Sequence, residues 1–189
     1  MKKTIGVLSV QGAFEEHIKM LEQLDVNCLE IRKKTDLTGH TIDGLVLPGG
    51  ESTVIGKLIR ELDLFTPLKT LIEADMPVLG TCAGLILLAG RIADVETIHL
   101  GTMDITARRN AYGRQLGSFQ TDEAFDALGK IPMVFIRAPY IESVGEKVEV
   151  LARVDNHIVA AKQDHMIVTS FHPELTNSLT VHRYFLNLI

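Results

Sequence analysis

An alternation of short apolar strands with amphipathic helices runs through the first half of the chain, and it strongly restricts the possible folds. Strands are predicted at four apolar segments, Thr4–Val10, Cys28–Ile31, Gly44–Leu47 and Pro77–Gly80. Helices are predicted from Ala13, from Ser52 as a capping residue, after Pro67 and over Ala83–Ala89. Strands that alternate with helices form a parallel sheet with helices on both faces. Right-handed crossovers place the strand-to-helix loops at one edge of that sheet, where ligands bind.

The second half of the sequence is richer in strands. Extended segments are predicted at Ile131–Ile136, Val148–Val154, Ile158–Ala161 and Met166–Phe171. Asp155 and Asn156 predict a hairpin turn between two of them, and Leu179–Leu188 predicts a closing helix. Because no repeat or linker interrupts the pattern, we expect residues 1–189 to form one domain. The expected architecture is a three-layer α/β sandwich with a mostly parallel, mixed central sheet.

Composition excludes several classes of function. The formal net charge of -5 leaves no basic footprint, so we expect neither nucleic acid nor an anionic membrane surface as a partner. The 2 cysteines form no C-x-x-C pair, so we expect no disulfide framework and no cysteine zinc site. We also expect no other bound metal and no cofactor. No apolar run is long enough to cross a bilayer, and the first residues predict a strand rather than a signal peptide. The cytoplasm is the expected compartment.

The segment Gly80-Thr81-Cys82-Ala83-Gly84 is the strongest local signal for chemistry. It lies between a predicted buried strand and an apolar helix, as in a nucleophile elbow, where a tight turn exposes the reactive side chain above the sheet. A helix N-terminus favours the thiolate form of cysteine over the thiol. A cysteine is more often packed as a small apolar residue, but the flanking glycines favour a nucleophile here. Cys28 lacks such a context and is predicted to lie in the core.

A thiol nucleophile needs a base, and His172 is the best placed of the 7 histidines. It directly follows the last predicted strand and precedes Pro173, which biases its backbone away from helix. If that strand is parallel to the first ones, His172 and Cys82 meet at the same sheet edge. Glu174 is close enough to orient the imidazole and to stabilise its charged form. His165 is the second candidate, but it begins the same strand and is expected at the opposite end.

Two further features could bind an acyl substrate. The turn Pro48-Gly49-Gly50-Glu51-Ser52 follows a predicted parallel strand, so its N–H groups are expected to face the same crevice. A simple strand-to-helix turn explains the turn equally well. Arginines in the segments 108–115 and 136–140 could bind a carboxylate through the guanidinium fork. A solvated surface arginine is the default interpretation of both.

These motifs, taken together, resemble those of triad-type, or class I, glutamine amidotransferases. The closer resemblance is to the glutaminase subunits of pyridoxal 5′-phosphate synthases. The blocks that carry it, in the order of that family, are Gly6–Ala13, Leu47–Thr53, Gly80–Leu85, Arg109–Gln115, Phe135–Pro139 and His172–Thr176. The resemblance implies a flavodoxin-like sandwich that hydrolyses L-glutamine to glutamate and ammonia. Ammonia would serve pyridoxal 5′-phosphate (vitamin B6) biosynthesis.

The same resemblance implies roles for individual residues. Cys82 would attack the side-chain amide and form a thioester, with His172 protonating the departing ammonia and Glu174 orienting it. Residues implied to bind glutamine are Gly49, Gly50, Glu51, Arg109, Ile136 and Arg137. Backbone N–H groups near Gly50 and Ala83 would form the oxyanion hole, and Gln11 and Gly12 would contact and respond to a partner. That partner would be the synthase subunit, which is a (β/α)8 barrel that receives the ammonia within a large hetero-oligomer.

Three alternatives remain at this point. The chain could be a glutaminase that serves a different synthase, although the block Arg109–Gln115 argues against it by resemblance. It could be a stress-response protein with a cysteine elbow, acting as a chaperone or on small aldehydes, although such proteins need no His-Pro-Glu after the last strand. It could also be a regulatory binding module that keeps the pocket without turnover, against which the intact triad weighs.

Overall fold

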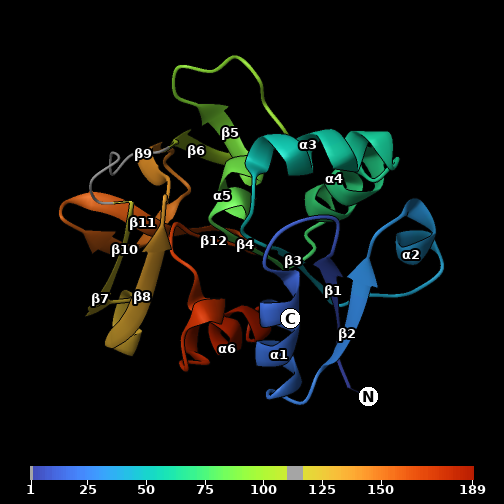
Figure 1. Cartoon of the computed structure of the whole chain (residues 1–189), viewed down its shortest axis with the longest axis horizontal. Coiled ribbons are helices and arrows are strands. Elements are labelled where there is room, and N and C mark those ends of the chain that lie inside the picture. The colour runs from blue at the N-terminus through green and yellow to red at the C-terminus, as the bar shows by residue number, and fades with distance from the viewer. Residues whose placement is uncertain (1, 110–116) are drawn as a thin grey trace.

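The fold is a layered α/β sandwich, seen here in a computed structural model that describes residues 2–109 and 117–189 (Figure 1). Residues 110–115 of the predicted basic segment lie outside the described part of the chain. In the described part, ten strands form one sheet, in the order β2-β1-β3-β4-β12-β11-β9-β6-β5 with β10 paired to β11. No helix in this part is long and apolar enough to span a membrane.

The five strands from β2 to β12 in that order are parallel, and the remainder of the sheet is mixed. Their bounds are Thr4–Leu8 (β1), Asn27–Ile31 (β2), Gly44–Leu47 (β3), Val78–Thr81 (β4) and Met166–Thr169 (β12). The mixed part consists of Ala89–Ile92 (β5), Met103–Arg108 (β6), Tyr140–Val144 (β9), Glu149–Val154 (β10) and His157–Gln163 (β11). Strands Ser118–Ala124 (β7) and Lys130–Ile136 (β8) form a separate antiparallel ribbon.

Helices cover both faces of the sheet (Figure 1). Their bounds are Phe14–Glu22 (α1), Lys34–Thr38 (α2), Ser52–Glu61 (α3), Phe65–Glu73 (α4), Ala83–Leu88 (α5) and Thr180–Leu186 (α6), with 3-10 turns at Asp126–Leu128 (η1) and Pro173–Leu175 (η2). Residues of α3, α4 and α5 pack into one apolar cluster, and residues of α1 and α6 pack into the other. The expected three-layer sandwich with a mixed, mostly parallel sheet is therefore confirmed.

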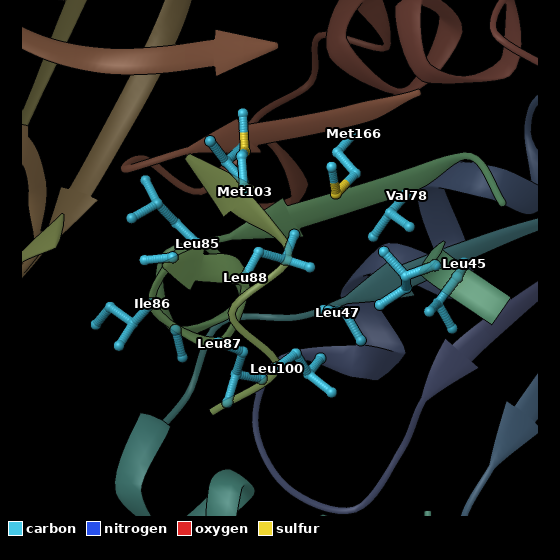
Figure 2. Close-up of a cluster of buried hydrophobic side chains, with 14 of the residues drawn as sticks. Leu45, Leu47, Val78, Leu85, Ile86, Leu87, Leu88, Leu100, Met103 and Met166 are labelled. Atoms are coloured by element: carbon cyan, nitrogen blue, oxygen red, sulfur yellow. The ribbon is translucent and has the colours of Figure 1, made fainter. Parts of the chain in front are cut away.

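Successive residues of the central strands supply the two clusters alternately, as the period of a strand requires. In β3, Leu45 and Leu47 face the helices α3 to α5, whereas Val46 faces α1 and α6. Figure 2 shows Leu45, Leu47 and Val78 beside the leucines of α5. Both faces of these strands are buried, which is why their sequences are continuous apolar runs rather than alternating ones.

Several sequence predictions need correction. The helix α3 starts at Ser52 with Glu51 at the capping position and no capping bond from its side chain, so Ser52 is not the cap. The helix α4 starts at Phe65, and Pro67 lies in its first turn, where a missing N–H costs no hydrogen bond. Cys28 is only half-buried, because β2 is the edge strand of the sheet.

Other predictions of local structure are confirmed or were incomplete. Asp155 and Asn156 both adopt positive φ, at 48° and 66°, and connect the antiparallel strands β10 and β11. Four strands, β5, β6, β7 and β9, and the short helix α2 were not predicted. Their sequences are mixed in polarity, and β7 is exposed or half-buried along its whole length, so no apolar period marks it.

Two glycines allow α5 to lie against the sheet. A Cβ on Gly80 would lie 2.9 Å from the carbonyl carbon of Gly84, and a Cβ on Gly84 would overlap the carbonyl oxygen of Leu47. Both obstacles are backbone atoms, which cannot move aside as a flexible side chain could.

We predict that Gly84→Ala lowers the free energy of unfolding by roughly 1–3 kcal/mol, because it forces α5 away from β3. Urea unfolding followed by circular dichroism measures this. The matched control is Gly39→Ala at an exposed helix end with φ -92°, which is expected to change stability by about 0.5 kcal/mol or less. Equal effects of the two substitutions would contradict the packing described here.

Candidate active site

The pairing of two parallel strands brings the predicted nucleophile and base to one edge of the sheet. Strand β12 pairs with β4 from Met166 opposite Val78 to Thr169 opposite Thr81, so both strands end at the same level. The backbone N–H of Cys82 then donates to the carbonyl oxygen of Thr169 at 2.8 Å. The condition that the sequence left open, that the last strand runs parallel to the first ones, is met.

Cys82 occupies a strained turn between β4 and α5. Its backbone angles are φ 50° and ψ -98°, a region that non-glycine residues rarely adopt and that costs roughly 1–3 kcal/mol. The residue is the N-cap of α5, next to the free N–H groups of the helix start, and its side chain makes no capping hydrogen bond. This geometry is that of a nucleophile elbow.

His172 approaches the thiol from the end of β12. Its backbone N–H donates to the carbonyl oxygen of Val134 in β8 at 2.8 Å, which fixes the chain after the strand. Its ring lies close enough to the side chain of Cys82 for that group to raise the pKa of the imidazole. Gly49 lies against both groups: a Cβ there would overlap the Cε1 atom of His172 and lie 3.3 Å from the Cβ of Cys82. Only glycine leaves room for the two groups to meet.

Glu174 lies behind the imidazole, in the turn η2. Its Oε1 is 2.6 Å from Nδ1 of His172, and both side chains are buried. The short distance is typical of a charge-assisted hydrogen bond. It leaves Nε2 as the ring nitrogen that faces the thiol side.

Electrostatics favour a charged pair at this position. Burial lowers the pKa of His172, but hydrogen bonds with Cys82 and Glu174 and the charges of both groups outweigh it and raise the pKa to about 10. Burial also opposes ionisation of Glu174, yet the nearby His17 and His172 hold the pKa of this carboxyl below its usual value. Near neutral pH, His172 is therefore an imidazolium and Glu174 a carboxylate.

A pocket of about 330 Å³ opens over the thiol. Its lining includes every residue to which the family resemblance gave a role except Ala83 and Glu174. The lining residues are Gln11, Gly12, Ala13, Gly49, Gly50, Glu51, Ser52, Cys82, Ile86, Arg109, Ile136, Arg137, Pro139, His172 and Leu175. Of these, Ala13, Ile86, Pro139 and Leu175 were given no role from the sequence, because small and apolar lining residues have no chemical signature.

The glycine turn forms one wall of the pocket, and the segment after β1 holds it. The N–H of Ala13 donates to the carbonyl oxygen of Gly49 at 2.9 Å, and the N–H of Glu51 donates to Oε1 of Gln11 at 2.9 Å. Gly12, at φ 99°, passes so close that a Cβ would overlap the carbonyl oxygen of Gly49. The segment Gln11–Ala13 is therefore in direct contact with the turn.

Two arginines reach the pocket and a third does not. Arg109 follows β6, and Arg137 follows β8 at φ 42°, with its backbone N–H bonded to the carbonyl oxygen of Gly117. Arg108 instead pairs with Asp94 at 2.8 Å and with Glu142 at 2.6 Å on the surface. In the described part of the chain, Arg109 and Arg137 are the cationic side chains that line this pocket.

Comparison with known proteins adds to this geometry. Residues 7–189 match the SNO glutamine amidotransferase family. The chain belongs to this family. A protein named pyridoxal 5′-phosphate synthase subunit PdxT from Haemophilus influenzae (strain PittEE) is 56% identical over 186 residues, which cover 97% of each chain. A protein of the same name from Streptococcus pneumoniae (strain CGSP14) is 55% identical over 97% of this chain and 96% of its own.

Solved structures agree with the assignment to the SNO family. A crystal structure described as a glutamine amidotransferase superposes with a TM-score of 0.92 at 44% identity and covers 97% of both chains. The structure of PurLQS from Thermotoga maritima has a TM-score of 0.72 at 16% identity over 99% of both chains, which shows a shared fold. SNO family membership argues against the stress-response interpretation.

The other residues considered in the sequence analysis, His165 and Cys28, lie away from the pocket. His165 lies beyond the start of β12, at the end of the sheet opposite the pocket, as expected. Burial and Glu22 raise the pKa of Cys28 to about 11, so this thiol stays protonated. A buried group of His17, Thr81 and His182 adjoins Glu174 and was not anticipated as part of the site. Both histidines lie on apolar helix faces, where sequence spacing cannot separate a core residue from a functional one.

We predict that the His172 ring titrates near pH 10 and that Glu174→Gln moves this titration toward the ordinary value of about 6.5. The direction follows because the carboxylate stabilises the charged ring, and its removal releases the proton at lower pH. Histidine side-chain nuclear magnetic resonance measures both values. A wild-type ring that loses its proton near pH 6.5 would contradict the charged pair.

Proposed function

We propose that this protein hydrolyses L-glutamine to L-glutamate and ammonia at Cys82, and that the ammonia supports pyridoxal 5′-phosphate synthesis. The observation that carries the proposal is the alignment of Cys82, His172 and Glu174 under one pocket. The identity of more than half of the residues to proteins named PdxT supports the synthesis that the ammonia serves.

The first half-reaction forms a thioester. The sulfur of Cys82 attacks the side-chain carbonyl carbon of glutamine as a thiolate, with the imidazolium of His172 beside it. The tetrahedral oxyanion is stabilised by backbone N–H groups at Gly50 and Ala83, the latter at the first position of a helix. When the C–N bond breaks, His172 gives its proton to the departing nitrogen and ammonia leaves.

The second half-reaction releases glutamate. His172 is now neutral and takes a proton from a water molecule, which attacks the thioester carbonyl carbon. The carbon–sulfur bond breaks, the thiolate returns, and His172 keeps the proton that it needs for the next cycle. Glu174 holds the ring in one tautomer through both steps, since its Oε1 accepts from Nδ1 at 2.6 Å.

The charges around the pocket suit an amino acid. We assign the α-carboxylate to Arg109 and Arg137 and the α-ammonium to Glu51, all of which line the pocket. The exposed side chain of Ile136 packs along the substrate's methylene groups, and the glycines Gly49 and Gly50 let the substrate approach the main chain.

The partner in this proposal is the synthase subunit, which is a (β/α)8 barrel that takes up the ammonia within a large hetero-oligomer. Its point of action is Gln11–Gly12, which contacts the turn that supplies the Gly50 N–H. The carbonyl oxygen of Gly49 accepts a hydrogen bond from the N–H of Ala13. Docking on the segment Gln11–Ala13 would re-orient the peptide bond between Gly49 and Gly50 and complete the oxyanion hole. We place the reaction in the cytoplasm, where a reducing environment keeps a working thiol free.

We predict that Cys82→Ala abolishes ammonia release from glutamine while leaving the fold intact, because no other group can form the thioester. A coupled glutamate dehydrogenase assay, with and without the synthase subunit, measures the rate. The isolated wild-type chain is expected to be slow and to accelerate when the partner is added.

The matched control for this experiment is Cys28→Ala, which removes the other thiol and is expected to leave the rate unchanged. A folded, active Cys82→Ala variant would refute the nucleophile. Equal wild-type rates with and without the synthase subunit would refute the role of Gln11–Gly12, but not that of Cys82.

A further inference from the structure

A buried group of polar side chains continues from the triad into the protein interior. The Oε2 of Glu174 is 3.4 Å from Nε2 of His17, and that nitrogen is also 3.0 Å from Oγ1 of Thr81. On the other side of the ring, Nδ1 of His17 is 2.9 Å from Nε2 of His182. All four side chains are buried, and they come from α1, α6, β4 and η2.

The protonation states of the two histidines follow from their surroundings. Burial lowers the pKa of His17 more than the charge of Glu174 raises it. Burial, with His17, lowers the pKa of His182 to about 3. Both rings are therefore neutral near pH 7, and each has one N–H donor and one bare nitrogen.

Only one arrangement of those protons fits the contacts. If His17 carried its proton on Nδ1, its bare Nε2 would face the carboxylate of Glu174, and His182 would hold a buried N–H on Nδ1. Among the described residues, Nδ1 of His182 has no hydrogen-bond partner, and a buried N–H without an acceptor is the costlier arrangement. The proton of His17 therefore lies on Nε2, between Glu174 and Thr81, and His182 donates to Nδ1.

This arrangement gives the outer oxygen of Glu174 its only donor side chain in the described part of the chain. By strict geometry Oε2 has no hydrogen bond there, and Nε2 of His17 lies 3.4 Å from it. A buried carboxylate with a free oxygen is costly and is free to rotate. The same N–H reaches Thr81, the residue before Cys82, so one ring contacts both the carboxylate and the nucleophile strand.

We propose that His17 is a positioning residue of the triad: it holds Oε2 of Glu174 so that Oε1 stays on His172, and His182 fixes its tautomer. The inference rests on the proposed function, since it assigns a role within that triad. His17 belongs to α1, which starts directly after the segment Gln11–Ala13. The helix that follows the segment in contact with the glycine turn thus also positions the acid–base pair.

The test compares three substitutions of His17 in the complete complex with the synthase subunit. The amide nitrogen of His17→Gln replaces Nε2, whereas that of His17→Asn replaces Nδ1, and His17→Phe keeps only the ring volume. Because misplacement of a catalytic group by about 1 Å costs on the order of 100-fold, we expect His17→Asn and His17→Phe to lower kcat roughly 10- to 100-fold. His17→Gln is expected to recover most of the wild-type kcat, and KM for glutamine is expected to stay within about threefold in all three.

Leu21→Ala is the control for a purely structural effect, since Leu21 is buried on the same helix and lies outside the group of polar side chains behind the triad. It is expected to lower the melting temperature without lowering kcat. Wild-type kcat in His17→Asn and His17→Phe, or equal losses in all three His17 variants, would overturn the inference. The proposed function is tested separately. If Cys82→Ala abolishes the turnover of the wild-type complex, the proposed function stands whichever result the His17 variants give.

Discussion

The parallel pairing of β4 with β12 is the interaction that fixes the geometry of the whole site. Four residue pairs hold the two strands in register, and the N–H of Cys82 extends the contact to Thr169. A slip of one residue would turn each side chain of β12 to the opposite face and move Ile167 from one apolar cluster to the other, so the packing of both clusters maintains the register. Once the register is set, the two strands end at the same level of the sheet. Cys82 and His172, which follow these ends, therefore lie side by side.

Burial then decides the electrostatics. His172 and Glu174 are removed from water, so each depends on the other for its charge, and the pair is worth more than it would be on the surface. The same burial makes unpaired polar atoms costly, which is why the groups behind the triad matter for its geometry. Gly49 permits the close approach, since any side chain there would displace the imidazole.

The sequence was most informative where strand ends are defined. Cys82 and His172 each follow a strand with a continuous apolar pattern, and parallel strands end at a common edge, so their proximity could be predicted. Their roles, and the organisation of residues 1–189 as one domain, stay predictions. The group around His17 could not be predicted, because helical spacing treats a buried histidine like any core residue. Four strands were missed because their partners, rather than their own polarity, define them.

The convergence of the two strand ends on one substrate can be measured in a crystal structure of the protein after reaction with a diazoketone analogue of glutamine. We expect a covalent bond from Cys82 to the analogue, the His172 ring within hydrogen-bonding distance of the reacting group, and the amino-acid end between Arg109 and Arg137. A bond to Cys28 instead, or an imidazole turned away from the adduct, would contradict this convergence.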